Sequence, residues 1–152
     1  MQTPPRIMIV EARFYEDIAD ALAAGVLAEL DAAGASYDRY EVAGAFELPA
    51  AIRIAVGARG NAGVAPQYDG YIALGCVIRG ETTHYETICA ESARGLMDLS
   101  IEHGIALANG ILTVENREQA WARASVADKN KGRDFALACL GMIDLRRQFG
   151  AD

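Results

Sequence analysis

The residues best suited to chemistry lie in one short polar segment, Arg79-Gly80-Glu81-Thr82-Thr83-His84. This segment directly follows an apolar run over 71–78 that predicts a buried strand, and a helix is expected to begin at about His84. In an open α/β sheet, ligands bind beyond the carboxyl ends of the strands, where N–H groups at a helix start can hold an anion. The segment offers a guanidinium, a glycine that permits close backbone approach, two hydroxyls and an imidazole. The sequence therefore predicts a catalytic site here.

His84 is the candidate for proton transfer in this segment. The positive end of a helix disfavours an imidazolium, so a neutral imidazole at this position could accept a proton near neutral pH. The alternative is that Thr82 and Thr83 only cap the helix and that His84 is a solvated residue of its first turn. No serine or cysteine stands in an obvious relay with His84. The two His and three Cys residues show no ligand spacing, so no metal site is expected.

Two further segments place aromatic or acidic groups just after expected strands. Phe14 follows a strand expected over 7–10, and its ring could either stack on a planar ligand or pack the loop onto the next helix. The turn Gly44-Ala45-Phe46-Glu47-Leu48-Pro49 follows a strand expected over 37–42. Glu47 could accept hydrogen bonds from ligand hydroxyls, or it could serve only as a first-turn carboxylate stabilised by the helix dipole. Without further context, packing is the favoured reading for Phe14 and the first-turn role is favoured for Glu47.

The charge balance limits the ligands that the chain can attract. Fourteen basic and twenty-one acidic residues give a net charge of −7, which argues against a general affinity for nucleic acid or anionic membranes. An anionic substrate must then be held by a few local groups. One basic cluster is available, formed by Arg123, Lys129, Lys131 and Arg133. Unless this cluster approaches the anion site after the 71–78 strand, it is a solvated surface.

The elements that must position these residues alternate regularly. Strands are expected over 7–10, 37–42, 71–78 and within 105–114. Helices are expected over 18–30, 48–56, about 84–103 and 134–149. A further short helix should begin at a capping box formed by Asn116 and Gln119. Polar loops are expected over 57–67 and 128–132. Parallel strands joined by helices need crossovers, so the sheet should be parallel with helices on both faces. The predicted fold is α/β, a three-layer α/β/α sandwich.

Length and composition agree with one domain over residues 1–152. A chain of this length with 52% hydrophobic residues can bury a substantial core. Its apolar runs are too short to span a bilayer, and the first six residues lead into only four apolar ones, which indicates no secretory signal. The three cysteines are odd in number and widely spaced, which is typical of reduced thiols in a cytoplasmic protein.

Six motifs, in this order, resemble the 6,7-dimethyl-8-ribityllumazine synthase family. They are Phe14, G-A-F-E-L-P at 44–49, Y-D-G-Y-I-A-L-G-C-V-I-R-G-E-T-T-H at 68–84, G-I-L-T-V-E-N at 110–116, Q-A-W-A-R at 119–123 and N-K-G at 130–132. The resemblance covers nearly the whole chain. It implies a flavodoxin-like fold with a four-stranded parallel sheet. It also implies the penultimate step of riboflavin biosynthesis, in which 5-amino-6-(D-ribitylamino)uracil condenses with 3,4-dihydroxy-2-butanone 4-phosphate without metal or organic cofactor.

The resemblance also implies a role for each matching residue. The pyrimidine and its ribityl chain would be bound by Phe14, Ala45, Phe46, Glu47, Val77 and Ile78. The phosphate would be bound by Gly80, Glu81, Thr82 and Arg123. His84 would transfer protons, and Lys131 would approach the substrate from a neighbouring subunit. Asn109 departs from the pattern, because many relatives place there an aromatic ring that covers the bound pyrimidine from the adjacent subunit.

The resemblance further implies homopentamers, which can stack or close into capsids, with two small-molecule substrates as the other partners. Three other readings stay open: an inactive relative that binds flavin or lumazine, a self-assembling structural protein, and a generic phosphosugar-binding module. The presence of both His84 and Arg123 argues against the first. The third would not need Phe14, the 44–49 turn and the His84 segment together. Assembly and catalysis are compatible, so the second does not exclude an enzyme.

Overall fold

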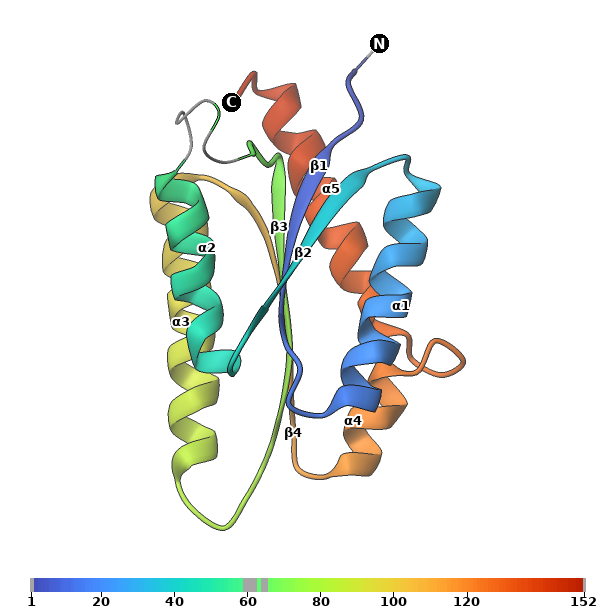
Figure 1. Ribbon diagram of the computed structural model, residues 1–152, viewed down its shortest axis with the longest axis vertical. Helices are drawn as coiled ribbons and strands as arrows, with labels where there is room; N and C mark the ends of the chain where they lie inside the picture. The colour runs from blue at the N-terminus through green and yellow to red at the C-terminus, as the bar shows by residue number, and fades with distance from the viewer. Residues whose placement is uncertain (1, 59–62, 64–65, 152) are drawn as a thin grey trace.

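Four parallel strands form the centre of the computed structural model (Figure 1). They are β1 (Arg6–Ala12), β2 (Ser36–Val42), β3 (Gly70–Ile78) and β4 (Ala106–Val114), in the order β2-β1-β3-β4 across the sheet. The structure describes residues 2–58, 63 and 66–151. Because all neighbouring strands are parallel, the carboxyl ends of all four lie toward the same end of the sheet. This topology confirms the predicted parallel sheet.

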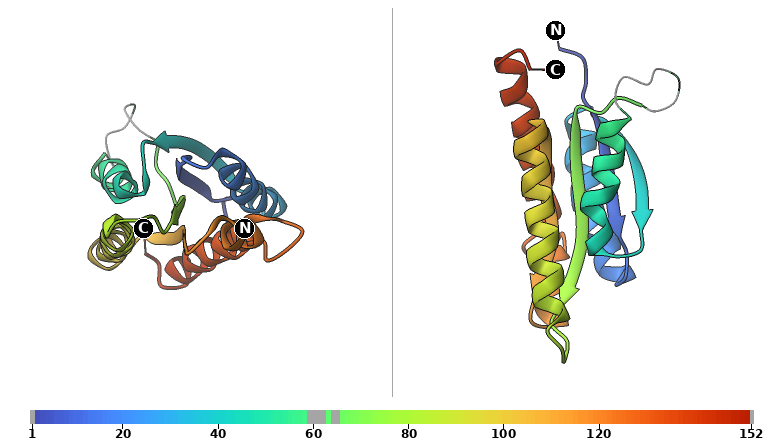
Figure 2. Two further views of the ribbon diagram at one scale, coloured as in Figure 1. Left: turned by 90° about the horizontal axis from the view of Figure 1, so that it is seen from below. Right: turned by 90° about the vertical axis from the view of Figure 1, so that its left-hand side faces the viewer.

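Helices cover both faces of the sheet (Figures 1 and 2). On one face lie α2 (Leu48–Gly57), which follows a short 3-10 turn η1 (Ala45–Glu47), and α3 (His84–His103). On the other face lie α1 (Glu16–Ala32), α4 (Arg117–Ala124) and α5 (Lys131–Gln148). The predicted three-layer α/β/α sandwich is therefore confirmed.

The sheet is buried on both faces, and β1 shows why. Met8 and Val10 belong to the core beneath α2 and α3, whereas Ile7 and Ile9 belong to the core beneath α1 and α5. Successive side chains of a strand point to opposite faces, so a central parallel strand needs apolar residues at every position. The continuous apolar run in the sequence reflects this two-sided burial.

Helix boundaries lie within two residues of the predicted ones except at the start of α5. The helix begins at Lys131, before the expected start at Asp134, and shortens the expected 128–132 loop. At the short helix α4, the Asn116 side chain accepts a hydrogen bond from the N–H of Gln119 at 2.9 Å, as the capping box predicts. The loop expected over 57–67 includes residues 59–62 and 64–65, which lie outside the described residues.

Helices α1 and α5 pack closely where Gly132 faces the backbone of α1. Gly132→Ala should destabilise the fold by about 1–3 kcal/mol, because it overpacks this contact. An added Cβ would lie 3.0 Å from the backbone N of Val26 and closer still to the carbonyl oxygen of Leu22. Urea unfolding at a fixed protein concentration measures the change.

Gly141→Ala is the matched control in the same helix. A Cβ at Gly141 meets nothing within 4 Å, so alanine should stabilise α5 by up to about 1 kcal/mol. Unchanged stability of Gly132→Ala would show that the two helices can separate at no cost.

Candidate active site

Three connections at the carboxyl end of the sheet carry most of the predicted site residues (Figure 1). They are the β1–α1 connection with Phe14, the turn after β2, and the segment between β3 and α3. The last pair between β1 and β3 is Glu11 with Leu74, whereas pairing between β3 and β4 continues to Ile78 and Val114. The end of β3 therefore extends past β1 and forms a step beside the first two connections.

Val77 and Ile78 lie on this step and point to opposite faces. Val77 packs against the core under α2 and α3, and Ile78 packs against a smaller cluster that involves α1 and α4. Both are only partly buried, because β1 does not extend beside them. Of the two, Val77 thus lies on the same face as α3.

The turn after β2 exposes two of the three residues that were predicted to meet a ligand. Ala45 is buried, whereas Phe46 is 55% exposed and Glu47 is also exposed. Glu47 occupies the N-cap position of α2, yet its side chain makes no capping hydrogen bond. Its carboxylate thus remains available for ligand hydroxyls. Pro49 lies in the first turn of α2, where its missing N–H costs no helical hydrogen bond.

Arg79 is engaged by the protein itself. Its Nε donates to Glu115 at 2.7 Å, its Nη1 donates to Glu86, and its guanidinium lies over the Tyr85 ring at 4.3 Å. The hydrogen bonds to Glu115 and Glu86 raise the pKa of Arg79 above its ordinary value. Arg79 therefore links the end of β4 to the start of α3, and its guanidinium is already bound by two carboxylates of the protein.

His84 is the first residue of α3, and its side chain is exposed. Its backbone N–H donates to the Thr82 hydroxyl at 3.3 Å, while the N-cap residue Thr83 makes no side-chain capping bond. The alternative reading, in which the threonines cap the helix, is thus correct for Thr82, because its hydroxyl accepts the first N–H of α3. The imidazole itself is not needed for this cap. Gly80 and Glu81 are exposed in the same segment, and a Cβ at Gly80 would meet nothing within 4 Å.

One chain does not bring Arg123 to His84. Arg123 lies on α4, on the other face of the sheet from α3, and its Nη1 donates to the carbonyl oxygen of Gln119 in its own helix at 3.0 Å (Figure 2). Lys131 starts α5 and pairs with Asp134 at 3.3 Å. Arg123 is therefore on the opposite face of a single subunit from His84, whereas the other predicted phosphate-binding residues, Gly80, Glu81 and Thr82, directly precede His84.

Asn109 lies on β4, which is an edge strand of the sheet. Its side chain is exposed, and its Oδ1 accepts a hydrogen bond from the N–H of Ile111 at 3.0 Å. The amide thus satisfies a backbone donor of its own strand. On the outer side of an edge strand, a backbone N–H has no neighbouring strand to which it can donate. The Asn109 side chain supplies the missing acceptor.

The sequence analysis did not single out three charged residues beside the β1–α1 connection. They are Glu11, Arg13 and Arg39. Glu11 lies near the end of β1 and is only 4% exposed, and its carboxylate accepts hydrogen bonds from the two arginines. The signal in the sequence is an acidic residue directly after the apolar run of β1. A buried carboxylate needs such partners, because an unpaired charge is costly in a core.

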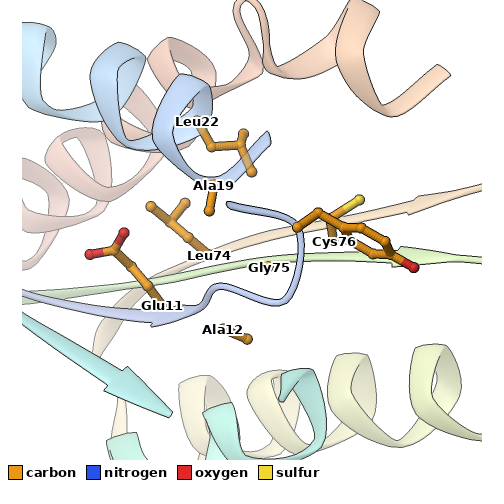
Figure 3. A pocket seen from close by; sticks show the side chains of 8 residues that line it. Glu11, Ala12, Ala19, Leu22, Leu74, Gly75 and Cys76 are labelled. Carbon is orange, nitrogen blue, oxygen red and sulfur yellow. The ribbon is translucent and has the colours of Figure 1, made fainter. Parts of the chain in front are cut away.

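A cavity of about 10 Å³ lies beside Glu11, between β1, β3 and α1 (Figure 3). A volume of this size holds at most one water molecule, so it does not accommodate a substrate. Among the residues that the structure describes, no three His, Cys, Asp or Glu side chains group as metal ligands would. In the same part of the chain, no helix is both long and apolar enough to cross a membrane.

Comparison with known proteins finds relatives over nearly the whole chain. A model of the 6,7-dimethyl-8-ribityllumazine synthase family matches residues 4–147. A protein of that name from Afipia carboxidovorans is 57% identical over 146 residues, covering 96% of this chain and 88% of the relative. 6,7-Dimethyl-8-ribityllumazine synthase 1 from Rhizobium meliloti is 54% identical, with 98% and 96% covered. The relative from Bartonella tribocorum is 53% identical, with 99% and 95% covered.

Proposed function

Because the chain belongs to the 6,7-dimethyl-8-ribityllumazine synthase family, we propose that its active site is the edge where β1, β2 and β3 end. The enzyme condenses 5-amino-6-(D-ribitylamino)uracil with 3,4-dihydroxy-2-butanone 4-phosphate, releasing phosphate and water. This is the penultimate step of riboflavin biosynthesis. The observation that carries the assignment is the family match over residues 4–147, which includes every segment that contributes to this edge.

The ribityl pyrimidine binds against the step formed by β3. Phe14 is 78% exposed and supplies a ring face for stacking on the pyrimidine. The turn at Ala45, Phe46 and Glu47 binds the ribityl hydroxyls through its backbone and the free carboxylate of Glu47. Val77 lies beside the ring with Ile78 next to it. Holding this substrate in place provides much of the catalysis, because amine attack on a ketone requires two small molecules to lose their translational freedom.

The butanone phosphate binds at the start of α3. The backbone of Gly80, Glu81 and Thr82 and the N–H groups of the first helical turn face its phosphate, with Arg123 supplying a charge-assisted contact. His84 moves protons during dehydration of the carbinolamine to the imine and during loss of phosphate. Positive charge near the departing oxygens favours phosphate release.

The working unit is a homopentamer or a multiple of pentamers in which neighbouring subunits share each site. This arrangement is supported by the position of Arg123 on the face of the sheet opposite His84. It is also supported by large apolar side chains exposed on the outer helices, namely Ile54, Met97, Ile101, Leu137, Met142 and Leu145. Lys131 and Asn109 belong to the neighbour's contribution. Residues 1–152 are one domain, and the cysteines, which are free, fit a cytoplasmic location.

Product formation from the two substrates tests the proposed function directly. Purified protein should produce fluorescent 6,7-dimethyl-8-ribityllumazine at a rate well above the uncatalysed background. Control reactions lack the protein or contain only one substrate. An inactive lumazine-binding relative would bind the product without raising the rate. Turnover no faster than background, with product binding intact, would support that second reading and refute the enzyme.

Asn109→Phe should tighten binding of the pyrimidine by roughly two- to tenfold, because a stacked ring adds about 0.5–1.5 kcal/mol. Asparagine has no aromatic face, and its Oδ1 is occupied by the Ile111 N–H. Fluorescence titration measures the change, with Asn109→Ala as the control that removes the amide without adding a ring. Equal affinity of wild type and Asn109→Phe, with density for the new ring over the ligand, would show that stacking contributes nothing here.

A further inference from the structure

Glu11 is a buried charge in a strand whose neighbouring residues are apolar. It is 4% exposed, and Figure 3 shows its side chain pointing toward the α1 layer, opposite to Ala12. A carboxylate removed from water loses several kcal/mol of solvation, and its partners only partly restore this. A well-packed apolar residue would therefore be at least as good for stability. The charge at this position calls for an explanation other than stability.

Two arginines bind the Glu11 carboxylate. Arg39 of β2 donates from Nε at 2.7 Å and from Nη2 at 2.9 Å, a two-pronged arrangement that fixes the orientation of the carboxylate. Arg13 donates from Nη1 at 2.8 Å, and its Nη2 donates to Asp20 of α1. Arg13 is thus held between β1 and α1. The network connects two strands, one helix and the segment between them.

Arg13 directly precedes Phe14, which is 78% exposed. The ring meets Tyr15 edge-on, with centroids 4.9 Å apart and planes at 81°. Tyr15 is half-buried and packs against the apolar cluster under α1 and α4. Because the ring is exposed, few packing contacts fix its orientation. The direction of Phe14 therefore depends on the anchored residues on either side of it.

We propose that the network of Glu11, Arg13 and Arg39 is a positioning device that aims the Phe14 ring at the pyrimidine. Arg13 and Tyr15 fix the two ends of a connection whose middle residue is the stacking ring. A ring that is already oriented loses less conformational freedom when the ligand binds, so pyrimidine affinity rises without a direct contact from the network. The proposal rests on the proposed function, because it assumes that Phe14 stacks on this substrate.

A double-mutant cycle between Arg13 and Phe14 tests the proposal. Arg13→Ala should raise the KM for the pyrimidine about three- to tenfold, with kcat changed less than about twofold. Phe14→Ala should raise the same KM. In the Phe14→Ala background, Arg13→Ala should have little further effect, because the group that it positions is gone. Arg13→Lys should restore part of the affinity, since an ammonium cannot bridge both carboxylates as the guanidinium does.

Arg6→Ala is the matched control at the other end of β1. Arg6 also binds a carboxylate through two nitrogens, donating to Asp38 at 3.1 and 2.7 Å, but far along the strand from Phe14. Its loss should leave the KM for the pyrimidine unchanged. Glu11→Gln keeps the shape of the side chain and should act in the same direction as Arg13→Ala. Thermal unfolding and sizing verify that each variant is folded and assembled.

The possible outcomes distinguish failure of the positioning role from failure of the enzyme assignment. If the wild type forms no product, both fail. If it forms product but the effects of Arg13→Ala and Phe14→Ala on KM simply multiply, the positioning role fails and the enzyme assignment stands. An unchanged KM in both Arg13→Ala and Glu11→Gln would also overturn the role. So would an equal rise in Arg6→Ala, because the effect would then be a general loss of stability.

Discussion

His84→Ala should lower kcat by about ten- to a thousandfold, while the affinity for the ribityl pyrimidine changes little. The range reflects typical acid–base contributions and a reaction with an uncatalysed background. The fold should survive, because the His84 side chain is exposed and the helix start is capped through its backbone N–H by Thr82. Steady-state kinetics give kcat, and fluorescence titration gives the affinity.

His103→Ala is the matched control for this prediction. His103 is the other histidine of the chain and lies at the last residue of the same helix α3. Its replacement should leave kcat unchanged. An unchanged kcat in His84→Ala would remove His84 from the mechanism, and an equal loss in both variants would point to damage of α3 instead.

Arg123→Ala should raise the KM for the butanone phosphate by about ten- to a hundredfold, because a hydrogen bond to a charged group is worth about 1.5–3 kcal/mol. Arg123→Lys should recover only part of this, since a point charge does not reproduce the planar fork. The matched control is Arg117→Ala on the same helix, where the arginine pairs with Asp17. Loss of pyrimidine affinity alone would show that the role assigned to Arg123 is wrong.

Mixed assemblies extend this prediction to the subunit interface. An inactive His84→Ala subunit and an impaired Arg123→Ala subunit should regain activity when they are unfolded, mixed and refolded together. Some interfaces then combine an intact His84 from one chain with an intact Arg123 from its neighbour. Refolding each variant alone is the control. A fully active monomer would refute the shared site.

Most elements could be predicted because their signals are local. Gly104 ends α3 with φ 57°, and the bond from the Gln119 N–H to Asn116 starts α4, within a few residues in each case. The start of α5 was missed because it depends on contacts distant in sequence. Asn130 adopts a left-handed φ of 47°, and Gly132 packs on the backbone of α1.

The candidate site divides in the same way. Motifs adjacent to strand ends could be found from the sequence, since chain order alone places them at the carboxyl edge. The engagement of Arg79 could not, because its partner Glu115 is remote in sequence. The same holds for the bond between Glu11 and Arg39, which joins two strands. Which charged residue is free for a ligand is decided by such long-range pairs.

The strand order β2-β1-β3-β4 has a consequence for the chain during its synthesis. β1, α1 and β2 are synthesised first, so β1 can pair with β2 early. Its other neighbour in the sheet, β3, is synthesised only after α2 and the segment that follows α2. At about 5–20 residues per second, the apolar edge of β1 stays unpaired for seconds, which exposes it to aggregation. Glu11 and Arg39 both belong to the early strands, so their ion pair can form before β3 arrives. An inward-facing charge at an open edge discourages pairing with a foreign strand, so we expect Glu11 to limit such pairing by β1 until β3 is available.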